Sequence, residues 1–480
     1  MNANVVDDRI GSDLAQDSIQ ALPPELLRQA ADGGGSKIVL VVGAGVSVEA
    51  PTSLETGAAY ARDAHRRLVQ DGVLQDGDCA DPSDLSVLAD VVFEKGRGSQ
   101  RELTRRLPRD EWRTASPNRG HLLAAALLTE GVIQHVLSLN YDLAMQNAFS
   151  QLGNSNAVTF VHGPEDHGNV GSHAVIYLHR SVDQDEESWV LRKAALDDGW
   201  RGGWEEVIAA TNLAAPLTVF VGLGSPAQVL TDSVKRLAMA AQSQFYLVDP
   251  NPDSRFAAAL GDNLSDTVPM YWTRFMDALA NRVLAEQVEH LRVAGQSLLA
   301  EQSELDPQNF EEVLEAMASL DLLRLGRNRA RWLQEKFDYL GEGDTARRTC
   351  VADLLLGLGW VMRVLGTSEV SFDGESGARL SGQGVPDVSL TLLHGQGVRT
   401  WAALSSRLMA RNNALPPQQR VRHVLVAGLR SMAEFEIDDL IRGDTSEDLI
   451  RGADTLIPIP IDDARLRFQD DSDSFRRRLA

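Results

Sequence analysis

Cysteine is scarce in this chain of 480 residues, which holds only Cys79 and Cys350. Two thiols can build neither a disulfide framework nor a four-cysteine zinc site within one chain. Basic residues are also outnumbered, with 46 lysines and arginines against 68 aspartates and glutamates, and the formal net charge is −22. Because proteins bind phosphate backbones through clustered lysine and arginine, we expect no direct nucleic-acid binding.

Long apolar runs are missing as well. No stretch approaches the roughly 20 apolar residues that a membrane-spanning helix needs. Residues 1–20 are acidic and polar, whereas a secretory signal is basic and then apolar. We therefore expect no membrane span and a cytoplasmic location.

The overall composition is that of a folded protein, with 43% hydrophobic and 24% charged residues. The chain is too long for one hydrophobic core, so several domains are expected. We predict a flexible N-terminal arm (1–36) with a short helix at Pro24–Ala30 and a hinge at Asp32–Ser36, a catalytic domain (37–285), a helical connector (286–345) and a C-terminal domain (346–480).

In the catalytic segment, strand and helix patterns alternate. The run Lys37–Val42 is apolar after its first residue, as expected for a central parallel strand that is buried on both faces. Helices are predicted at Thr56–Gln70 and Gly120–Glu130. Further strands are predicted at Val132–Leu139, Val158–Val161, Ala174–Leu178, Leu217–Val221 and Gln244–Val248. This alternation predicts an α/β fold with a doubly wound parallel sheet.

The remaining sequence predicts a helical segment and then a smaller α+β domain. Helical periodicity covers Phe275–Glu301 and Phe310–Leu325. An apolar helix at Cys350–Leu365 precedes strands predicted at Val385–Leu393, Gly397–Leu404 and Arg422–Leu429. The turn His394–Gly397 would join the first two of these strands into a hairpin.

A glycine-rich segment, Gly43-Ala44-Gly45-Val46-Ser47, directly follows the first strand. In dinucleotide-binding folds, backbone amides and a helix N-terminus bind pyrophosphate at this place, and glycine is needed because a Cβ would block the phosphate. The spacing departs from the dehydrogenase pattern at Val48, and the Gly-Lys-Ser/Thr motif of ATPases is absent. The alternative is that this segment is only a turn at the end of the strand and binds no phosphate.

A second polar segment, Ser138-Leu139-Asn140-Tyr141-Asp142, ends the strand Val132–Leu139. Because α/β sheets bind ligands at the carboxyl ends of their strands, Asn140 and Asp142 are candidate site residues. The alternative is that both side chains only cap the helix predicted at Leu143–Gln151.

Together with later elements, these motifs form an ordered set that resembles the sirtuin family over residues 36–285. The set comprises the Gly-Ala-Gly-x-Ser loop, the helix around His121, Asn140-x-Asp142, the strand Val175–Leu178 that ends in His179, the turn Gly222-Leu223-Gly224-Ser225, and the strand Phe245–Val248 before Asp249. The resemblance implies a sirtuin-like variant of the Rossmann fold that takes NAD as its substrate.

The resemblance also implies roles for single residues. The NAD-binding residues would be Gly43, Ala44, Gly45, Ser47, Gly222, Gly224, Ser225 and Asp249. Asn140 would hold a ribose hydroxyl and the attacking water, Asp142 would orient the ribose or stabilise positive charge, and His179 would be the general base. His162, followed by Gly163, is a rival histidine. We prefer His179 because it ends the better strand and precedes the family-like segment Ser181–Leu191.

Two departures from the family change the expected reaction. Sirtuin deacylases carry a zinc module of four cysteines after the Asn-x-Asp region, whereas residues 150–349 contain no cysteine. We therefore expect neither zinc nor peptide deacylation. Arg180 stands where the family has glycine, and it would either reshape the acyl-substrate channel or reach an NAD phosphate.

The C-terminal segment loosely resembles restriction-endonuclease-like cores at Val385-Pro386-Asp387, His394–Gly397 and Arg399-Thr400-Trp401. Such nucleases need a second carboxylate and a lysine on the second hairpin strand, and Thr400, Trp401 and Ala402 supply neither. We predict a non-catalytic domain that senses, assembles or regulates, with the helical connector contributing to a homo-oligomer.

A zinc-less sirtuin-like domain fused to an unrelated domain resembles the NAD-depleting effectors of bacterial anti-phage systems, which stay inactive until a trigger assembles them. The leading hypothesis is therefore a regulated NAD⁺ hydrolase that releases nicotinamide and ADP-ribose. The alternatives are a non-catalytic sensor of NAD or ADP-ribose, an ADP-ribosyltransferase, and a structural subunit that works with a separately encoded ATPase or nuclease partner.

Overall fold

The computed structural model of the chain describes most of its length. The described residues are 19, 21–31, 38–224, 226, 228–240, 243–301, 307–334, 345–372, 377–382, 385–416, 420–430, 456–468 and 472–479. The predicted hinge Asp32–Ser36 and the candidate residue Ser225 lie outside them. The chain forms two compact units, Met1–Arg282 and Val283–Ala480.

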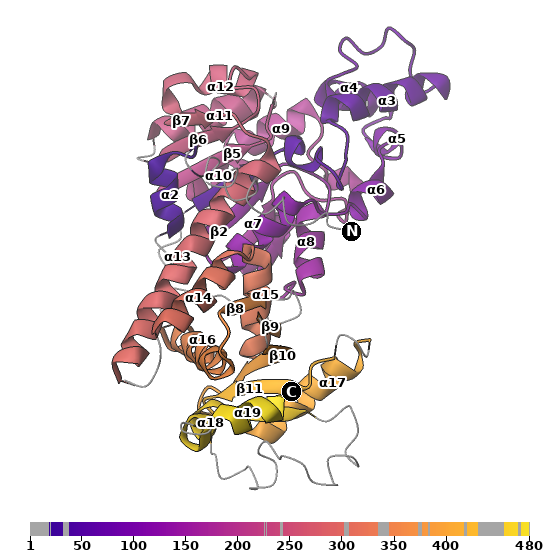
Figure 1. Ribbon diagram of the computed structural model, residues 1–480. Helices are drawn as coiled ribbons and strands as arrows, with labels where there is room; N and C mark the ends of the chain where they lie inside the picture. Colours follow the sequence, from indigo (N-terminus) through magenta and orange to yellow (C-terminus); the bar gives the residue numbers. More distant parts are fainter. Residues whose placement is uncertain are drawn as a thin grey trace, which may run out of the picture. The chain divides into compact units, whose positions relative to one another are not determined.

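A seven-stranded sheet forms the centre of the first unit (Figure 1). Its strands are β1 (Ile38–Val42), β2 (Ile133–Ser138), β3 (Thr159–Val161), β4 (Ala174–Tyr177), β5 (Leu217–Val221), β6 (Gln244–Val248) and β7 (Asp266–Val268). Every neighbouring pair is parallel. The predicted α/β fold is confirmed, and β7 is an additional edge strand too short to show a sequence pattern.

The strands are ordered β3-β4-β2-β1-β5-β6-β7 across the sheet. The chain therefore starts in the middle with β1, builds outward through β2 to β3 and β4, and then returns to build the other side from β5. Such a reversal leaves a crevice at the carboxyl ends of the central strands, where α/β sheets bind ligands. The segments that follow β1, β2 and β5 lie at this crevice.

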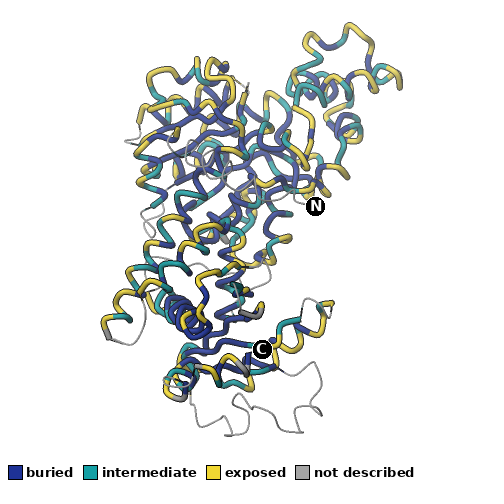
Figure 2. Tube along the Cα trace, viewed as in Figure 1, coloured by how far each residue is buried: buried dark blue, intermediate teal, exposed yellow. Residues whose placement is uncertain are grey.

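Helices cover the sheet and explain the continuous apolar strands. On one face, Val39, Val41 and Phe220 form an apolar cluster with residues of the helices α9 (Lys193–Trp200), α10 (Trp204–Leu213) and α11 (Gln228–Ala240). Successive side chains of a strand point to opposite faces, so the equally buried Ile38 and Leu40 face the opposite layer. There α7 (Arg119–Thr129) contacts β2 and packs on α8 (Ala144–Leu152). The strands β1, β4 and β5 are accordingly buried at every position (Figure 2).

Between β1 and β2 the chain forms a group of short helices. They are α3 (Gly57–Gln70), α4 (Leu85–Lys95), α5 (Arg101–Thr104) and α6 (Arg109–Arg113). Side chains mark where the longer ones begin, because Thr56 accepts a hydrogen bond from the backbone of Ala59 and Asp84 accepts from those of Ser86 and Val87. Earlier in the chain, α2 (Pro24–Ala31) buries Leu26 and Ala30, so this helix is packed against the unit.

A five-stranded mixed sheet forms the centre of the second unit, in the order β12-β11-β10-β9-β8. The strands are β8 (Glu369–Phe372), β9 (Gly377–Gly382), β10 (Val385–His394), β11 (His423–Ala427) and β12 (Ile457–Pro460). The buried helix α16 (Thr345–Leu365) packs on β10 and β11. The same core takes residues from α13 (Trp272–Glu301), α14 (Pro307–Ala318), α15 (Leu322–Trp332), α18 (Ile461–Phe468) and α19 (Ser472–Leu479). Over the described residues, no helix is both long and apolar enough to cross a membrane.

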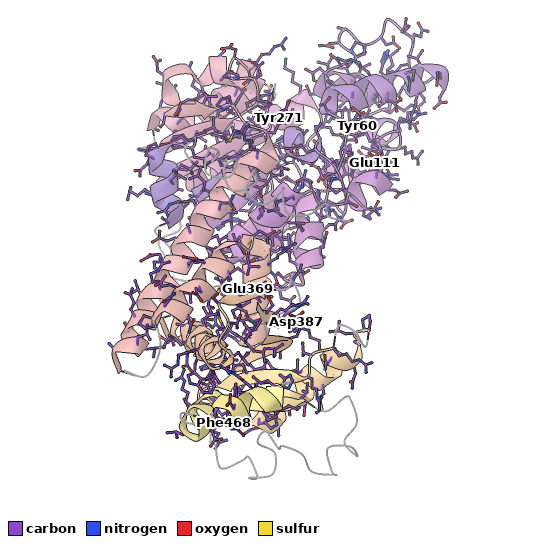
Figure 3. All side chains as sticks on the ribbon, in the orientation of Figure 1. Tyr60, Glu111, Tyr271, Glu369, Asp387 and Phe468 are labelled. Carbon is purple, nitrogen blue, oxygen red and sulfur yellow. The ribbon has the colours of Figure 1, made fainter. Side chains whose placement is uncertain are left out.

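The predicted strand at Gly397–Leu404, and with it the nuclease-like hairpin, is wrong. Thr400 accepts a hydrogen bond from the backbone of Ala403 and begins α17 (Trp401–Asn413). Trp401, Leu404 and Leu408 pack together with helical spacing, which a short apolar run does not distinguish from a strand. The antiparallel partner of β10 is instead the unpredicted β9, and Asp387 of β10 forms an ion pair with Arg379 of that strand (Figure 3).

The single helix predicted at Phe310–Leu325 is also wrong, because the segment contains two helices, α14 and α15. Asp321 separates them: its side chain accepts a hydrogen bond from the backbone nitrogen of Arg324 at 2.8 Å and caps α15. Phe310, Leu314 and Leu325 all join one core, so the apolar pattern continues across the break and conceals it.

Candidate functional site

A cavity of about 650 Å³ opens at the carboxyl ends of the central strands of the first unit. Its volume is in the range of sites for small organic ligands. The predicted site residues that line it are Gly43, Ala44, Gly45, Ser47, Asn140, Asp142, His179, Gly222, Gly224 and Asp249. The structure therefore brings together at one cavity segments that are up to about 200 positions apart in the chain.

Two glycine-containing loops touch each other at the floor of this cavity. The backbone nitrogen of Gly43 donates to the carbonyl oxygen of Val221 at 3.0 Å, and that of Gly45 donates to Gly222 at 2.9 Å. A Cβ on Gly43 would lie 2.8 Å from the Gly222 oxygen, and one on Gly45 would lie 2.7 Å from the Gly222 Cα. From the sequence, these glycines are expected to let a phosphate approach the backbone. In the structure, their lack of a Cβ permits the close contact between the two loops.

Asn118 holds the first loop in place, and the sequence analysis missed it. Its side-chain nitrogen donates to the carbonyl oxygen of Val46 at 2.8 Å. Its side-chain oxygen accepts from the backbone of His121, whose imidazole accepts from the backbone of Asn118 in return. This capping box begins α7. Burial lowers the pKa of His121 to about 3, so its ring is neutral. The sequence signal that could have identified Asn118 is an asparagine directly before an apolar helix.

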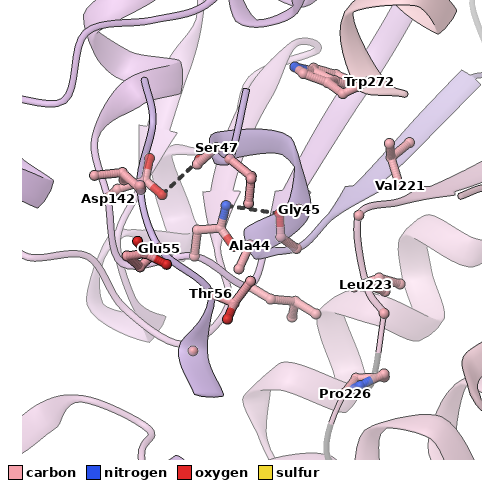
Figure 4. A pocket seen from close by; sticks show the side chains of 18 of the residues that line it. Ala44, Gly45, Ser47, Glu55, Thr56, Asp142, Val221, Leu223, Pro226 and Trp272 are labelled. Carbon is pink, nitrogen blue, oxygen red and sulfur yellow. Dashed lines mark hydrogen bonds between the residues drawn. The ribbon is translucent and has the colours of Figure 1, made fainter. Parts of the chain in front are cut away.

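Asp142 lies beside the same loop. Ser47 Oγ donates to one of its carboxylate oxygens at 3.0 Å, and the backbone nitrogen of Ala144 donates to the other at 3.0 Å (Figure 4). Burial raises the pKa of Asp142, and these two hydrogen bonds act in the opposite direction by stabilising the carboxylate. Asp142 thus hydrogen-bonds to the first residue of α8 and also lines the cavity.

Asn140 connects the segment after β2 to the glycine loop. Its side-chain nitrogen donates to the carbonyl oxygen of Gly43 at 3.1 Å, and its backbone nitrogen donates to Ser138 Oγ at 3.2 Å. The amide is therefore fixed where β1 and β2 end. Its nearness to Gly43 follows from the parallel pairing of the two strands.

His179 follows β4 and is only 8% exposed, yet it lines the cavity. Its Nε2 accepts a hydrogen bond from the indole nitrogen of Trp200 at 3.2 Å, and its ring also bonds to the backbone of Leu139. Burial, and secondarily the charge of Arg180, lowers the pKa of His179 to about 4. The imidazole is therefore neutral near pH 7, which is the form that accepts a proton.

The rival histidine has a different place. The ring of His162 stacks on Tyr177 with centroids 5.1 Å apart, and its Nδ1 lies 2.8 Å from Ser181 Oγ. His162 is not among the residues that line the cavity. The geometry thus favours His179 as the histidine that meets a ligand.

Arg180 forms a buried ion pair with Glu205 of α10. The Nη1–Oε1 distance is 3.1 Å, the two side chains are 13% and 5% exposed, and the guanidinium also lies 5.1 Å from the ring centre of Trp204. Arg180 is not among the residues that line the cavity, and its guanidinium faces Glu205 and Trp204. Its φ of 74° is the left-handed conformation that favours glycine, the residue expected here from the resemblance.

Replacing Arg180 by alanine is expected to lower the free energy of unfolding by about 3–5 kcal/mol, because Glu205 would keep a buried charge without its partner. The measurement is urea denaturation followed by circular dichroism. Arg180→Ala combined with Glu205→Gln is the matched control and should regain most of the loss. A loss under about 1 kcal/mol in the single variant would contradict this prediction, because it is the effect of removing a solvent-exposed ion pair.

Aromatic side chains form one wall of the cavity. Tyr60 of α3 and Trp112 of α6 meet edge to face with ring centres 5.4 Å apart, and Trp112 stacks on Tyr141 at 5.7 Å. Tyr60 also donates to Glu111 at 3.3 Å (Figure 3). The sequence analysis did not find this wall, because the three rings come from segments without a shared pattern. A flat, apolar ring is the kind of ligand group that it suits.

Within the ranges that the structure describes, no group of three or more histidine, cysteine, aspartate or glutamate side chains is arranged to hold a metal ion. The polar side chains at the cavity are the neutral imidazole of His179, the fixed amide of Asn140 and the carboxyl group of Asp142.

Among known proteins, similarity to this chain is found at the level of solved structures. No family model and no curated protein matches the chain. Among solved structures, a Sir2 enzyme is 16% identical with a TM-score of 0.30, over 54% of this chain and 97% of that one. A Sir2 homologue in complex with NAD is 18% identical with a TM-score of 0.32, over 55% and 94%. A Sir2 homologue mutant in complex with ADP-ribose is 18% identical with a TM-score of 0.30.

Proposed function

We propose that the first unit binds NAD⁺ in this cavity and hydrolyses the bond between nicotinamide and ribose. The observation that carries the proposal is the meeting of Asn140, Asp142 and His179 at one cavity beside the glycine loops. The order of these motifs along the chain, which resembles the sirtuin family, supports NAD as the ligand. The aromatic wall offers a surface for a planar base.

In the proposed reaction, the bond between the ribose C1′ and the nicotinamide nitrogen breaks, and its electron pair leaves with nicotinamide. Water attacks the cationic C1′ and forms the new C–O bond, and one proton is released. NAD⁺ and water thus give nicotinamide, ADP-ribose and a proton. The transition state resembles the oxocarbenium ion of glycoside hydrolysis.

Each polar residue has a part in this scheme. Asn140 holds a ribose hydroxyl and the water, which removes the entropic cost of bringing them together. The carboxylate of Asp142 stabilises the positive charge on the ribose. His179 takes the proton on its neutral ring. The loops around Gly43–Ser47 and Gly222–Gly224 bind the phosphates, and Asp249, which also lines the cavity, binds the adenosine ribose.

Asn140→Ala is expected to lower NAD cleavage by roughly 10²–10³-fold, the usual effect of removing one preorganised hydrogen-bonding group. Nicotinamide and ADP-ribose released from NAD by the purified full chain would be quantified chromatographically. Asn263→Ala is the control, since the half-buried Asn263 donates to the carbonyl oxygen of Leu260 and is not among the residues that line the cavity. Cleavage by Asn140→Ala at the rate of the unaltered chain would overturn the assignment.

We further propose that the chain is a regulated effector of bacterial anti-phage defence that depletes NAD. In this proposal the second unit is non-catalytic and assembles the chain into a homo-oligomer or binds a trigger or ATPase partner. Adding extract from phage-infected cells to the purified chain should then raise nicotinamide release. The same extract with His179→Ala should not.

One observation favours a second candidate, an NAD or ADP-ribose sensor without catalysis. The lone pair that His179 would use as a base is already hydrogen-bonded to Trp200. Calorimetry distinguishes the two functions: a chain that binds NAD and never releases nicotinamide, with or without extract, is a sensor.

A further inference from the structure

Both nitrogens of the His179 ring are engaged within the protein. One bonds to the backbone of Leu139, and Nε2 accepts the indole hydrogen of Trp200 at 3.2 Å. The two rings meet edge to face, with centres 6.2 Å apart and planes at 87°. An indole nitrogen is only a donor, so Nε2 must be the unprotonated nitrogen of the imidazole. The tautomer of His179 is thereby fixed.

Trp200 is held firmly in this position. It ends α9, is 1% exposed, and belongs to the apolar cluster formed by α9, α10, α11 and one face of the sheet. Its carbonyl oxygen also accepts a hydrogen bond from Ser233 Oγ of α11 at 2.5 Å. Trp200 does not line the cavity, whereas His179 does. The indole thus approaches the histidine from the protein side and not from the ligand side.

We propose that Trp200 is a positioning residue that withholds the Nε2 lone pair of His179, so that His179 accepts a proton only after this hydrogen bond breaks. The inference rests on the proposed role of His179 as general base. It goes beyond that role because it identifies the internal contact that limits the base. An imidazole that already accepts one hydrogen bond on its single lone pair has no second acceptor site for water or a ribose hydroxyl.

Among the described residues around His179, the neighbouring polar groups are engaged elsewhere and Trp200 is the donor to Nε2. Arg180 is adjacent in the chain and repels a proton on the imidazole, but it is paired with Glu205. The Tyr141 ring, after β2, has its centre 6.5 Å away, and its hydroxyl donates to the carbonyl oxygen of Val190. Among the contacts of the described residues, the donor to Nε2 is the indole of Trp200.

Trp200→Phe tests the inference, because it keeps an aromatic ring in the apolar cluster and removes the indole donor. In the full chain labelled with ¹⁵N-histidine at pH 7, the Nε2 resonance of His179 should move toward that of an unbonded, unprotonated nitrogen. Trp189→Phe is the matched control: Trp189 is equally buried, but its indole donates to the carbonyl oxygen of Gln184. His179→Ala identifies the resonance.

A second measurement is kinetic. An indole hydrogen bond stabilises the neutral imidazole, so its loss should raise the pKa of His179 and move the acidic limb of kcat/KM for NAD cleavage upward by about 0.7 pH units. Basal nicotinamide release near pH 7 should increase severalfold, and His179→Ala should cancel the increase.

Failure of the inference about Trp200 can be distinguished from failure of the proposed function. An Nε2 resonance that is the same in Trp200→Phe and in the unaltered chain would overturn the inference, whatever the enzyme does. If Trp200→Phe does not fold, the indole resonance of Trp200 in the unaltered chain replaces it, and failure of that resonance to respond to His179→Ala would equally overturn the contact. NAD cleavage that survives both His179→Ala and Asn140→Ala would instead overturn the proposed function.

Discussion

His179→Ala is expected to lower NAD cleavage by roughly 10²–10⁴-fold, the range that general base catalysis contributes. The loss should fall on kcat, because the glycine loops and Asn140 still hold the ligand. Nicotinamide release would be measured under conditions in which the unaltered chain is active, and NAD affinity would be measured by calorimetry.

The pH dependence of the unaltered chain is a separate prediction. Because burial and Arg180 lower the pKa of His179 to about 4, the unaltered chain should keep its rate of NAD cleavage down to about pH 5. A base with the ordinary pKa near 6.5 would lose activity below about pH 7.

His162→Ala is the matched control for His179→Ala. His162 is also a partly buried histidine after a neighbouring strand, but it stacks on Tyr177 and stays outside the cavity. The His162→Ala variant should cleave NAD at a rate close to that of the unaltered chain. The assignment is wrong if the two results are exchanged, with His162→Ala inactive and His179→Ala active.

Gly45→Ala is expected to weaken NAD binding by roughly tenfold or more, which corresponds to at least about 1.4 kcal/mol. The added Cβ would lie 2.7 Å from the Cα and 2.9 Å from the carbonyl oxygen of Gly222. Both are backbone atoms, so no side chain can rotate away, and the two loops must separate. Calorimetric titration with NAD measures the loss.

Gly77→Ala controls for the general cost of replacing glycine. Gly77 is exposed, and a Cβ there would meet nothing within 4 Å. Its affinity for NAD should not change, and circular dichroism should show that both variants are folded. If Gly45→Ala binds NAD as tightly as Gly77→Ala, the contact between the two loops is not what shapes the binding site.

The strands of the first unit could be predicted because of where they lie. Parallel strands covered on both faces are apolar at successive positions, so Lys37–Val42 and Leu217–Val221 stand out from the surrounding sequence. The second unit was harder. Gly397–Leu404 is apolar enough for either a strand or a helix, and only the core against which Trp401 and Leu404 pack makes it helical. Asp321 divides two helices whose apolar faces share one core, so the periodicity does not show the break.

The sequence by itself determined the strand-ending residues of the site. Gly43–Ser47, Asn140, Asp142 and His179 each follow an apolar strand, and a polar residue in that place is visible without a structure. Only the tertiary structure decided that these residues meet, because it places β1 between β2 and β5. The order of strands across a sheet does not follow from their order along the chain. The tertiary structure alone also supplied Trp112, Glu205 and Trp200, which come from helices with no local mark of function, and it showed that the helix cap Asn118 holds the glycine loop. Packing brings these side chains to the site, and packing depends on residues far apart in the sequence.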